Sequence, residues 1–145
     1  RELNDSMPSY IVEQATNFIK KSKLDISKAK ITILGLTFKE DCTDLRNSKV
    51  IELFNLIKMK GPSVYAHDPL LNTKIVKRNY NIDLIKWENL PVSDLIISAV
   101  SHKEYLQMGI STILSKLKPN GTFMDVKSIY SRNSIEKLGY KVWRL

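Results

Sequence analysis

The stretch Ile31-Thr32-Ile33-Leu34-Gly35 is a β-branched run that ends at a glycine and is too short for a helix. It predicts a buried strand. The run Asp94-Leu95-Ile96-Ile97-Ser98-Ala99-Val100 predicts a second one. Both runs are nearly continuously apolar, whereas a strand with one face in water alternates apolar and polar residues. Parallel strands covered by helices on both faces show this continuous pattern, so the two runs predict a parallel sheet.

The rest of the chain alternates between helical and extended patterns. After the first strand, apolar side chains recur at helical spacing from Val50 to Ile57. Further strands are predicted at residues 63–67, 122–126 and 140–143, a weak strand or extended loop at 82–86, further helices at 72–78, 110–117 and 134–138, and a turn at 119–121. Such alternation predicts right-handed βαβ units. The expected fold class is α/β, with a Rossmann-like parallel sheet flanked by helices and preceded by an N-terminal helix, in which Pro8 suits the first turn.

Length, charge and cysteine content limit the possible classes of protein. The 145 residues suit one domain of about 100–200 residues. No apolar run approaches the ~18–20 residues that cross a bilayer, and no signal peptide is recognisable, so we expect a cytoplasmic protein without a membrane partner. The net charge of +8 is carried by lysines that are mostly dispersed, so we expect no nucleic-acid partner.

The loop after the first strand is where a doubly wound sheet is expected to bind its ligand. It lacks the second and third glycines of a dinucleotide-binding fingerprint, so this chain is not predicted to bind NAD as a free-standing domain. It offers instead an aromatic ring at Phe38 and cations at Lys39 and Arg46, just before a helix capped by Asn47 or Ser48. These groups suit a nucleotide base and its phosphates.

Each of these residues has a purely structural alternative. Phe38 could belong to the core, Lys39 could be a solvated loop charge, and Arg46 could form an ion pair with Asp41 or Asp44. The sequence alone favours these alternatives, because most charged loop residues are simply solvated.

Four other residues have reactive or metal-binding side chains. Cys42, the single cysteine, stands among acidic residues that would disfavour a thiolate, so we assign it no catalytic role. His67 and His102 are expected to bind no metal, because neither a third histidine nor paired carboxylates complete a site. Asp68 precedes a proline and is either a ribose-holding residue or a turn residue.

Four motifs, in one order along the chain, resemble the C-terminal nucleotide-binding domain of UDP-glucose and UDP-N-acetylhexosamine 6-dehydrogenases. Gly35-Leu36-Thr37-Phe38-Lys39 with Asp44-Leu45-Arg46-Asn47-Ser48 is similar to the family's G-x-x-F-K and D-x-R-x-S stretch. The other three are Asn4-Asp5 with Met7-Pro8, Tyr65-Ala66-His67-Asp68-Pro69, and Phe123-Met124-Asp125-Val126-Lys127.

The resemblance implies roles for four residues. Phe38, Lys39 and Lys127 would bind the substrate, although many relatives have arginine in place of Lys127. Arg46 would approach NAD, which the family holds mainly on a separate N-terminal domain. The family's G-G-x-C-F/L-P-K nucleophile motif is not present in these residues, so the chain alone is expected to bind a nucleotide sugar without oxidising it.

The resemblance also implies an organisation and a function. Residues 1–27 would be the end of a central dimerisation helix with its joint, and residues 28–145 the UDP-sugar-binding domain. The helix has an apolar stripe of Ile11, Ala15, Phe18 and Ile19 with little domain left to cover, so it is expected to fold back or to pair with a second copy.

The parent enzyme would be an NAD-dependent dehydrogenase that converts the C6 alcohol of a UDP sugar to a uronic acid for capsule or O-antigen polysaccharide. UDP-N-acetylglucosamine or UDP-N-acetylgalactosamine is favoured as the substrate. The alternatives are a UDP-glucose enzyme, a nucleotide-sensing domain without catalysis and, from the lysine-rich first segment, a nucleic-acid module.

Overall fold

Five parallel strands form one sheet in the order β2-β1-β3-β4-β5. The computed structural model describes residues 4–145. The strands are β1 (Lys30–Leu34), β2 (Ser63–His67), β3 (Ser93–Ser98), β4 (Leu117–Asp125) and β5 (Lys141–Arg144). The predicted α/β class with a parallel sheet is confirmed.

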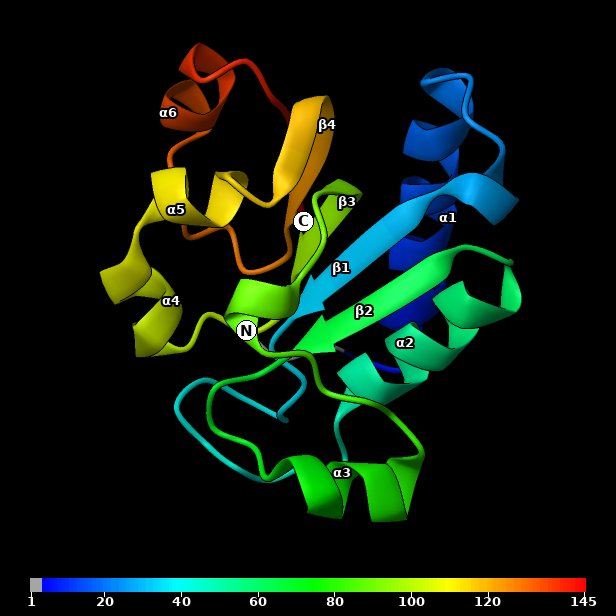
Figure 1. Ribbon diagram of the computed structural model, residues 1–145, viewed down its shortest axis with the longest axis vertical. Helices are drawn as coiled ribbons and strands as arrows, with labels where there is room; N and C mark the ends of the chain where they lie inside the picture. The colour runs from blue at the N-terminus through cyan, green and yellow to red at the C-terminus, as the bar shows by residue number, and fades with distance from the viewer. Residues whose placement is uncertain (1–3) are drawn as a thin grey trace.

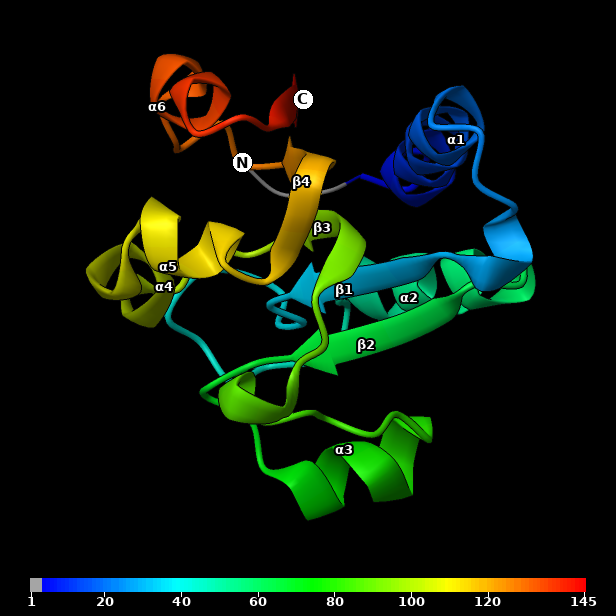
Figure 2. The same cartoon turned by 45° about the horizontal axis from the view of Figure 1, so that its top comes forward.

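Helices cover both faces of this sheet (Figure 1). One face carries α1 (Met7–Lys21) and α2 (Lys49–Met59), and the other carries α4 (Lys103–Met108), α5 (Ile110–Leu114) and α6 (Arg132–Lys137). Figure 2 shows α3 (Thr73–Tyr80) beyond the edge strand β2. Short 3-10 turns lie at Ile26–Lys28 and Trp87–Asn89. Among the described helices, none is long and apolar enough to cross a bilayer.

The strand order reverses between β1 and β3, which are neighbours in the centre of the sheet. From β1 the chain passes through α2 to β2 on one side, then returns past β1 to build the rest of the sheet on the other side. The loops that leave β1 and β3 therefore part in opposite directions, which opens a crevice at the carboxyl ends of these strands.

Gly35 allows these two loops to touch. Its φ is +85°, and a Cβ atom there would lie 2.7 Å from both the Cβ and the carbonyl oxygen of Val100. No larger residue fits this position without displacing backbone, so the glycine that ends the first apolar run is required by close approach and by backbone conformation.

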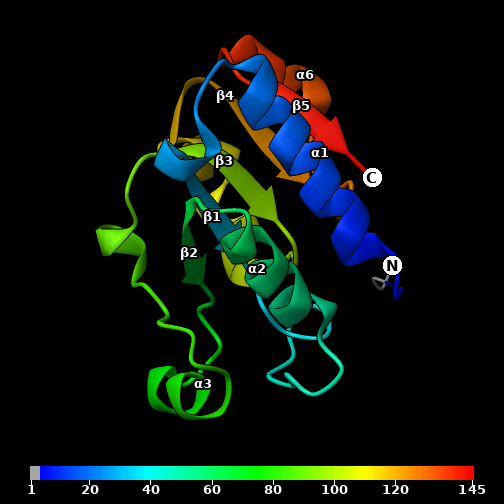
Figure 3. The same cartoon turned by 90° about the vertical axis from the view of Figure 1, so that its right-hand side faces the viewer.

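The apolar stripe of α1 packs onto the domain itself. Ile11, Ala15 and Ile19 are buried in one core with α2 and the central strands, while Phe18 is partly buried at its margin. Figure 3 shows α1 and α2 side by side across this face of the sheet. The expectation that the stripe had little domain left to cover was wrong, and of its two predicted outcomes the helix shows the folded-back one.

Two further segments differ from the sequence-based prediction, whereas residues 82–86 agree with the predicted weak strand or extended loop. The predicted turn at 119–121 lies inside β4, which advances from Leu117 to Thr122 while β3 advances only from Ser93 to Leu95, so the extra residues form a bulge. Helix α4 was not predicted. Residues 82–86 contribute a single bridge, in which Leu84 pairs with Ala66.

Candidate functional site

Residues from four segments line the crevice at the reversal of strand order. They come from the β1 loop, the start of α2, the β3 loop and the β4 loop, and are Phe38, Asn47, Lys49, Val50, Ala99, Val100 and Lys127. The enclosed cavity is only about 10 Å³, enough for roughly one water molecule. A nucleotide would therefore lie over this crevice, or the β1 loop would have to move to admit it.

The N-terminus of α2 faces this crevice. The Ser48 side chain caps the helix by accepting a hydrogen bond from the backbone N–H of Val50, and its hydroxyl donates to the carbonyl oxygen of Leu36. Of the two predicted cap residues, Ser48 is the one used. Asn47 has a φ of 70°, a left-handed conformation that asparagine tolerates. The first turn of an eleven-residue helix with Lys49 beside it is a favourable place for an anion.

Lys127 reaches the crevice from the opposite side, two residues after β4 ends. Its side chain is only 5% exposed, and its Nζ atom lies 3.6 Å from Oε2 of Glu40 in the β1 loop. Burying a charged group costs free energy unless it is paired or hydrogen-bonded, and Glu40 provides one such partner. The pair also connects the β1 loop to the β4 loop across the crevice.

The structure brings together two of the four residues predicted from sequence. Phe38 is half-buried and lines the crevice with Lys127, whereas Lys39 is exposed and lies outside the crevice lining. Arg46 points outward, with its side chain 87% exposed and its Nε atom 3.2 Å from Oδ1 of Asp44. Hydrogen bonds from Arg46 lower the pKa of the Asp44 carboxyl. This ion pair is one of the two structural alternatives that the sequence left open.

The loop after β1 has few glycines and a small cavity. Within the loop between β1 and α2, Gly35 is the single glycine, and the cavity beside it is far smaller than a dinucleotide. Arg46 extends outward from this loop. If NAD approaches this domain, Arg46 can offer it one solvated cation but no enclosed pocket.

A buried polar pair, missed by the sequence analysis, lies beneath the β1 loop. Nε2 of His102 lies 2.9 Å from Oδ2 of Asp68, and both side chains are completely buried. Asp68 also accepts hydrogen bonds from the backbone N–H groups of Leu36 and Leu70, at 2.8 and 2.9 Å. Its carboxylate is therefore fully engaged in holding a turn, so the turn alternative describes it.

The other candidate residues stay outside any assembled site. Cys42 is half-buried, and its Sγ accepts the N–H of Asp44 at 3.2 Å. His67 bonds to the hydroxyl of Tyr105 at 2.7 Å, and burial lowers its pKa. Within residues 4–145 no three histidine, cysteine or acidic side chains come close enough to hold a metal ion.

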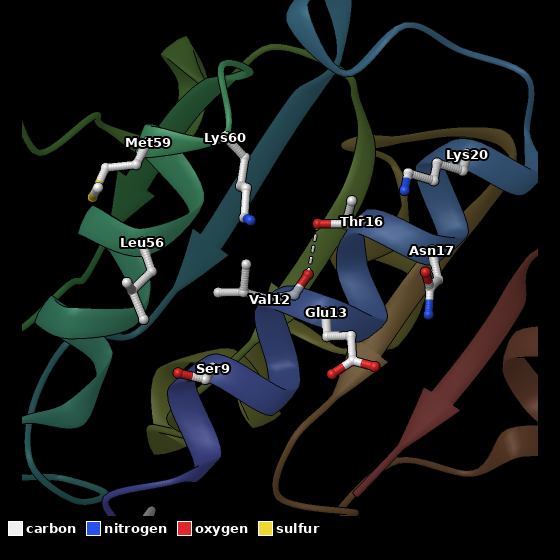
Figure 4. A pocket seen from close by; sticks show the side chains of 9 residues that line it. All are labelled: Ser9, Val12, Glu13, Thr16, Asn17, Lys20, Leu56, Met59 and Lys60. Atoms are coloured by element: carbon white, nitrogen blue, oxygen red, sulfur yellow. Dashed lines mark hydrogen bonds between the residues drawn. The ribbon is translucent and has the colours of Figure 1, made fainter.

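A larger hollow lies elsewhere, in a groove between α1 and α2 with a volume of about 570 Å³ (Figure 4). The α1 side contributes Val12 and mostly polar residues, and the α2 side contributes Leu56, Met59 and Lys60. It contains none of the residues predicted to bind a ligand. Size alone does not identify a site, and we place the candidate site at the crevice because there Phe38, Lys127 and a helix N-terminus meet.

Comparison with known proteins gives a consistent picture. The model of the UDP-glucose/GDP-mannose dehydrogenase family, UDP binding domain, matches residues 32–132. The chain is 32% identical over 145 residues to protein CapL of Staphylococcus aureus, covering 100% of this chain and 34% of CapL. It is 32% identical over 127 residues to the UDP-N-acetyl-D-glucosamine 6-dehydrogenase of Pseudomonas aeruginosa, covering 88% of this chain and 30% of that protein.

A solved structure supports the fold. The NDP-N-acetyl-D-galactosaminuronic acid dehydrogenase of Methanosarcina mazei Go1 superposes with a TM-score of 0.83 at 21% identity, covering 97% of this chain and 29% of that one. The chain thus spans about a third of the length of the curated relatives it matches.

Proposed function

The chain belongs to the UDP-glucose/GDP-mannose dehydrogenase family, as a UDP-binding domain, and we propose that it holds the UDP portion of a UDP sugar for oxidation at C6. One observation carries the proposal. Phe38, Lys127 and the N-terminus of α2 meet at the reversal of strand order, within residues that match the family's UDP-binding domain. An aromatic ring for the base and two positive centres for the diphosphate are the groups that UDP requires.

The oxidation itself is proposed to need parts of the enzyme outside these residues. NAD, which accepts hydride when bound, would be held mainly by another domain, and Arg46 would extend toward it. The nucleophile would also come from elsewhere, since Cys42 is engaged with Asp44. The domain's own task is then to bind and orient the nucleotide.

A UDP-N-acetylhexosamine is the favoured substrate, with the N-acetylglucosamine or N-acetylgalactosamine form preferred. The names of the Pseudomonas relative and of the Methanosarcina structure support this class. UDP-glucose is the alternative, and UDP-N-acetylmannosamine, the substrate named for other similar proteins, also belongs in any test. A cytoplasmic homo-oligomer that supplies uronic acids for surface polysaccharide is part of the same proposal.

Calorimetric titration with UDP tests the binding function directly. UDP should bind and should raise the melting temperature of the chain, because a ligand that binds only the folded state stabilises it. Lys127→Ala and Lys39→Ala should weaken binding, whereas Lys58→Ala, an exposed lysine on α2, should not. GDP and CDP are the competing ligands. Equal binding of all three would support a general nucleotide sensor, and salt-sensitive binding of DNA without a response to UDP would support a nucleic-acid module.

The chain by itself should not reduce NAD in the presence of any UDP sugar. Absorbance at the NADH band measures this. Sustained NADH formation by the purified 145-residue chain would contradict the proposed division of labour.

A further inference from the structure

A buried clamp holds both ends of the segment from Leu36 to Asp41, which carries Phe38 and Lys39. At the first end, the N–H of Leu36 donates to Oδ2 of Asp68 at 2.8 Å. At the far end, the N–H of Asp41 donates to Nδ1 of His102 at 3.0 Å. His102 and Asp68 then bond to each other at 2.9 Å, so that one pair of side chains joins the two ends.

The hydrogen bonds define the tautomer of the neutral His102 ring. Nδ1 accepts the Asp41 N–H, so in the neutral ring the proton sits on Nε2 and is donated to Asp68. Thr37 is consistent with this arrangement, because its hydroxyl donates to the Lys39 carbonyl at 2.8 Å and thus presents only lone pairs to Nε2 at 3.3 Å. His102 is therefore a bridge with one accepting and one donating nitrogen.

Burial makes this bridge stiff. Both side chains of the pair are completely shielded from water. The ring of Tyr105 stacks on the imidazole of His102, with 5.9 Å between the ring centroids. The far end has a second tie, since the N–H of Lys103 donates to Oδ1 of Asp41 at 2.8 Å. Within the pair, His102 and Asp68 have no water to replace a lost partner, so breaking their bond leaves a buried group unsatisfied, whereas Asp41 at the far end is itself exposed.

We propose that His102 is a positioning residue for nucleotide binding, which fixes the conformation of the segment that carries Phe38, in the crevice lining, and Lys39, exposed beside it. The inference rests on the proposed UDP-binding function. A preset loop binds more tightly because its ordering does not have to occur during binding. His102 touches no ligand in this proposal and acts through the backbone of Leu36–Asp41.

Two substitutions remove the two hydrogen bonds of the His102 ring one at a time. His102→Gln keeps an amide donor near the Nε2 position for Asp68 and loses the acceptor for Asp41. His102→Asn keeps an acceptor near the Nδ1 position for Asp41 and loses the donor for Asp68. We expect UDP to bind about tenfold more weakly to His102→Gln and less than threefold more weakly to His102→Asn, because only the former loses the bond from His102 to the far end of the segment and leaves that end held by the Lys103–Asp41 bond alone.

His67→Gln is the matched control. It also removes a buried histidine, but among the described residues the His67 ring hydrogen-bonds to Tyr105 and not to the segment Leu36–Asp41. It should lower the melting temperature without changing the dissociation constant for UDP. All titrations are made at a temperature where each variant is fully folded.

Three outcomes decide whether His102 is a positioning residue. The expected order of affinities supports the proposal. If His102→Gln is less stable yet binds UDP as the wild-type chain does, His102 is only structural and the proposal is overturned while the UDP-binding function stands. If the wild-type chain does not bind UDP, both the proposed role of His102 and the proposed UDP-binding function are wrong.

A measurement on the wild-type chain covers the case in which a variant does not fold. Nitrogen-15 NMR of the histidine ring should show an unprotonated Nδ1 and a protonated Nε2, and the amides of Leu36 and Asp41 should exchange slowly with solvent. The opposite tautomer, or fast exchange at Asp41, would overturn the clamp itself.

Discussion

The Nζ atom of Lys127 lies 3.6 Å from Oε2 of Glu40, and this contact spans the crevice between the β1 and β4 loops. The same Glu40 oxygen is buried and accepts no hydrogen bond in the described part of the chain. The Glu40 carboxylate is thus paired with Lys127, the cation that the proposed function assigns to the diphosphate. Ligand phosphates would have to compete with it.

Glu40→Gln should therefore strengthen UDP binding, by about three- to tenfold, because the competing charge is removed while the side-chain shape is kept. Titration calorimetry measures the change. Glu13→Gln, on an exposed part of α1, makes the same change in net charge and should leave the affinity nearly unaltered. An equal gain in both variants would mean that only overall charge matters, and no gain would mean that Glu40 does not compete.

Gly35→Ala should lower the free energy of unfolding by about 3 kcal/mol, since the new Cβ combines an unfavourable positive φ with overlap against Val100. Gly139→Ala is the matched control: its φ is also positive, at +93°, but no atom lies within 4 Å of the added Cβ. It should cost about 1 kcal/mol. Urea denaturation measures both, and equal losses would show that the loops around Gly35 can separate at no cost.

Ser48→Ala should cost about 1–2 kcal/mol of stability, because it removes the cap of α2 and the bond that ties the start of this helix to Leu36. Ser131→Ala removes a comparable cap from the short, exposed start of α6 and should cost about 0.5 kcal/mol. The comparison uses midpoints of urea denaturation. A smaller loss for Ser48 than for Ser131 would contradict a structural link between the helix start and the loop.

The features that were predictable from sequence are those coded by neighbouring residues. Continuous apolar runs identified β1 and β3, and helical spacing after a cap at Asn47 or Ser48 identified α2. Phe38 and Lys127 were assigned through the family resemblance, and the fold brings them to one crevice because the carboxyl ends of parallel strands share an edge.

The features that could not be predicted depend on contacts between distant residues. His102 and Asp68 are separated by more than thirty positions, and neither belongs to a motif that announces their pairing. Helix α4 has no side-chain cap, and of its six residues only Tyr105 is buried. Its apolar pattern is too weak to predict, because the helix depends on the fit of Tyr105 beside His67 and His102.

Acid should destabilise the domain partly through His67. Burial, the largest cause, lowers the pKa of this ring in the folded chain, with a smaller opposing effect from Asp68. The unfolded chain therefore takes up the proton first, and stability is lost as the pH falls from about 6.5 through the lowered folded pKa. Urea midpoints between pH 7.5 and 5 should fall less steeply in His67→Gln. Parallel slopes would assign the acid loss to groups other than His67.

The packing of α1 leads to a test of the proposed boundary after residue 27. Ile11 is fully buried in the core shared with α2, so Ile11→Ala should lower the free energy of unfolding by about 3 kcal/mol, as large-to-small changes in cores do. Asn17→Ala, at an exposed position of the same helix, should change it by less than about 0.5 kcal/mol.

Light scattering of both variants establishes whether two copies of the chain are associated. A helix buried between two copies would make the loss of stability at Ile11 depend on protein concentration. A loss that is large and independent of concentration means that α1 is folded onto its own domain. A negligible loss would mean that α1 adds little to the stability of the domain that begins at residue 28.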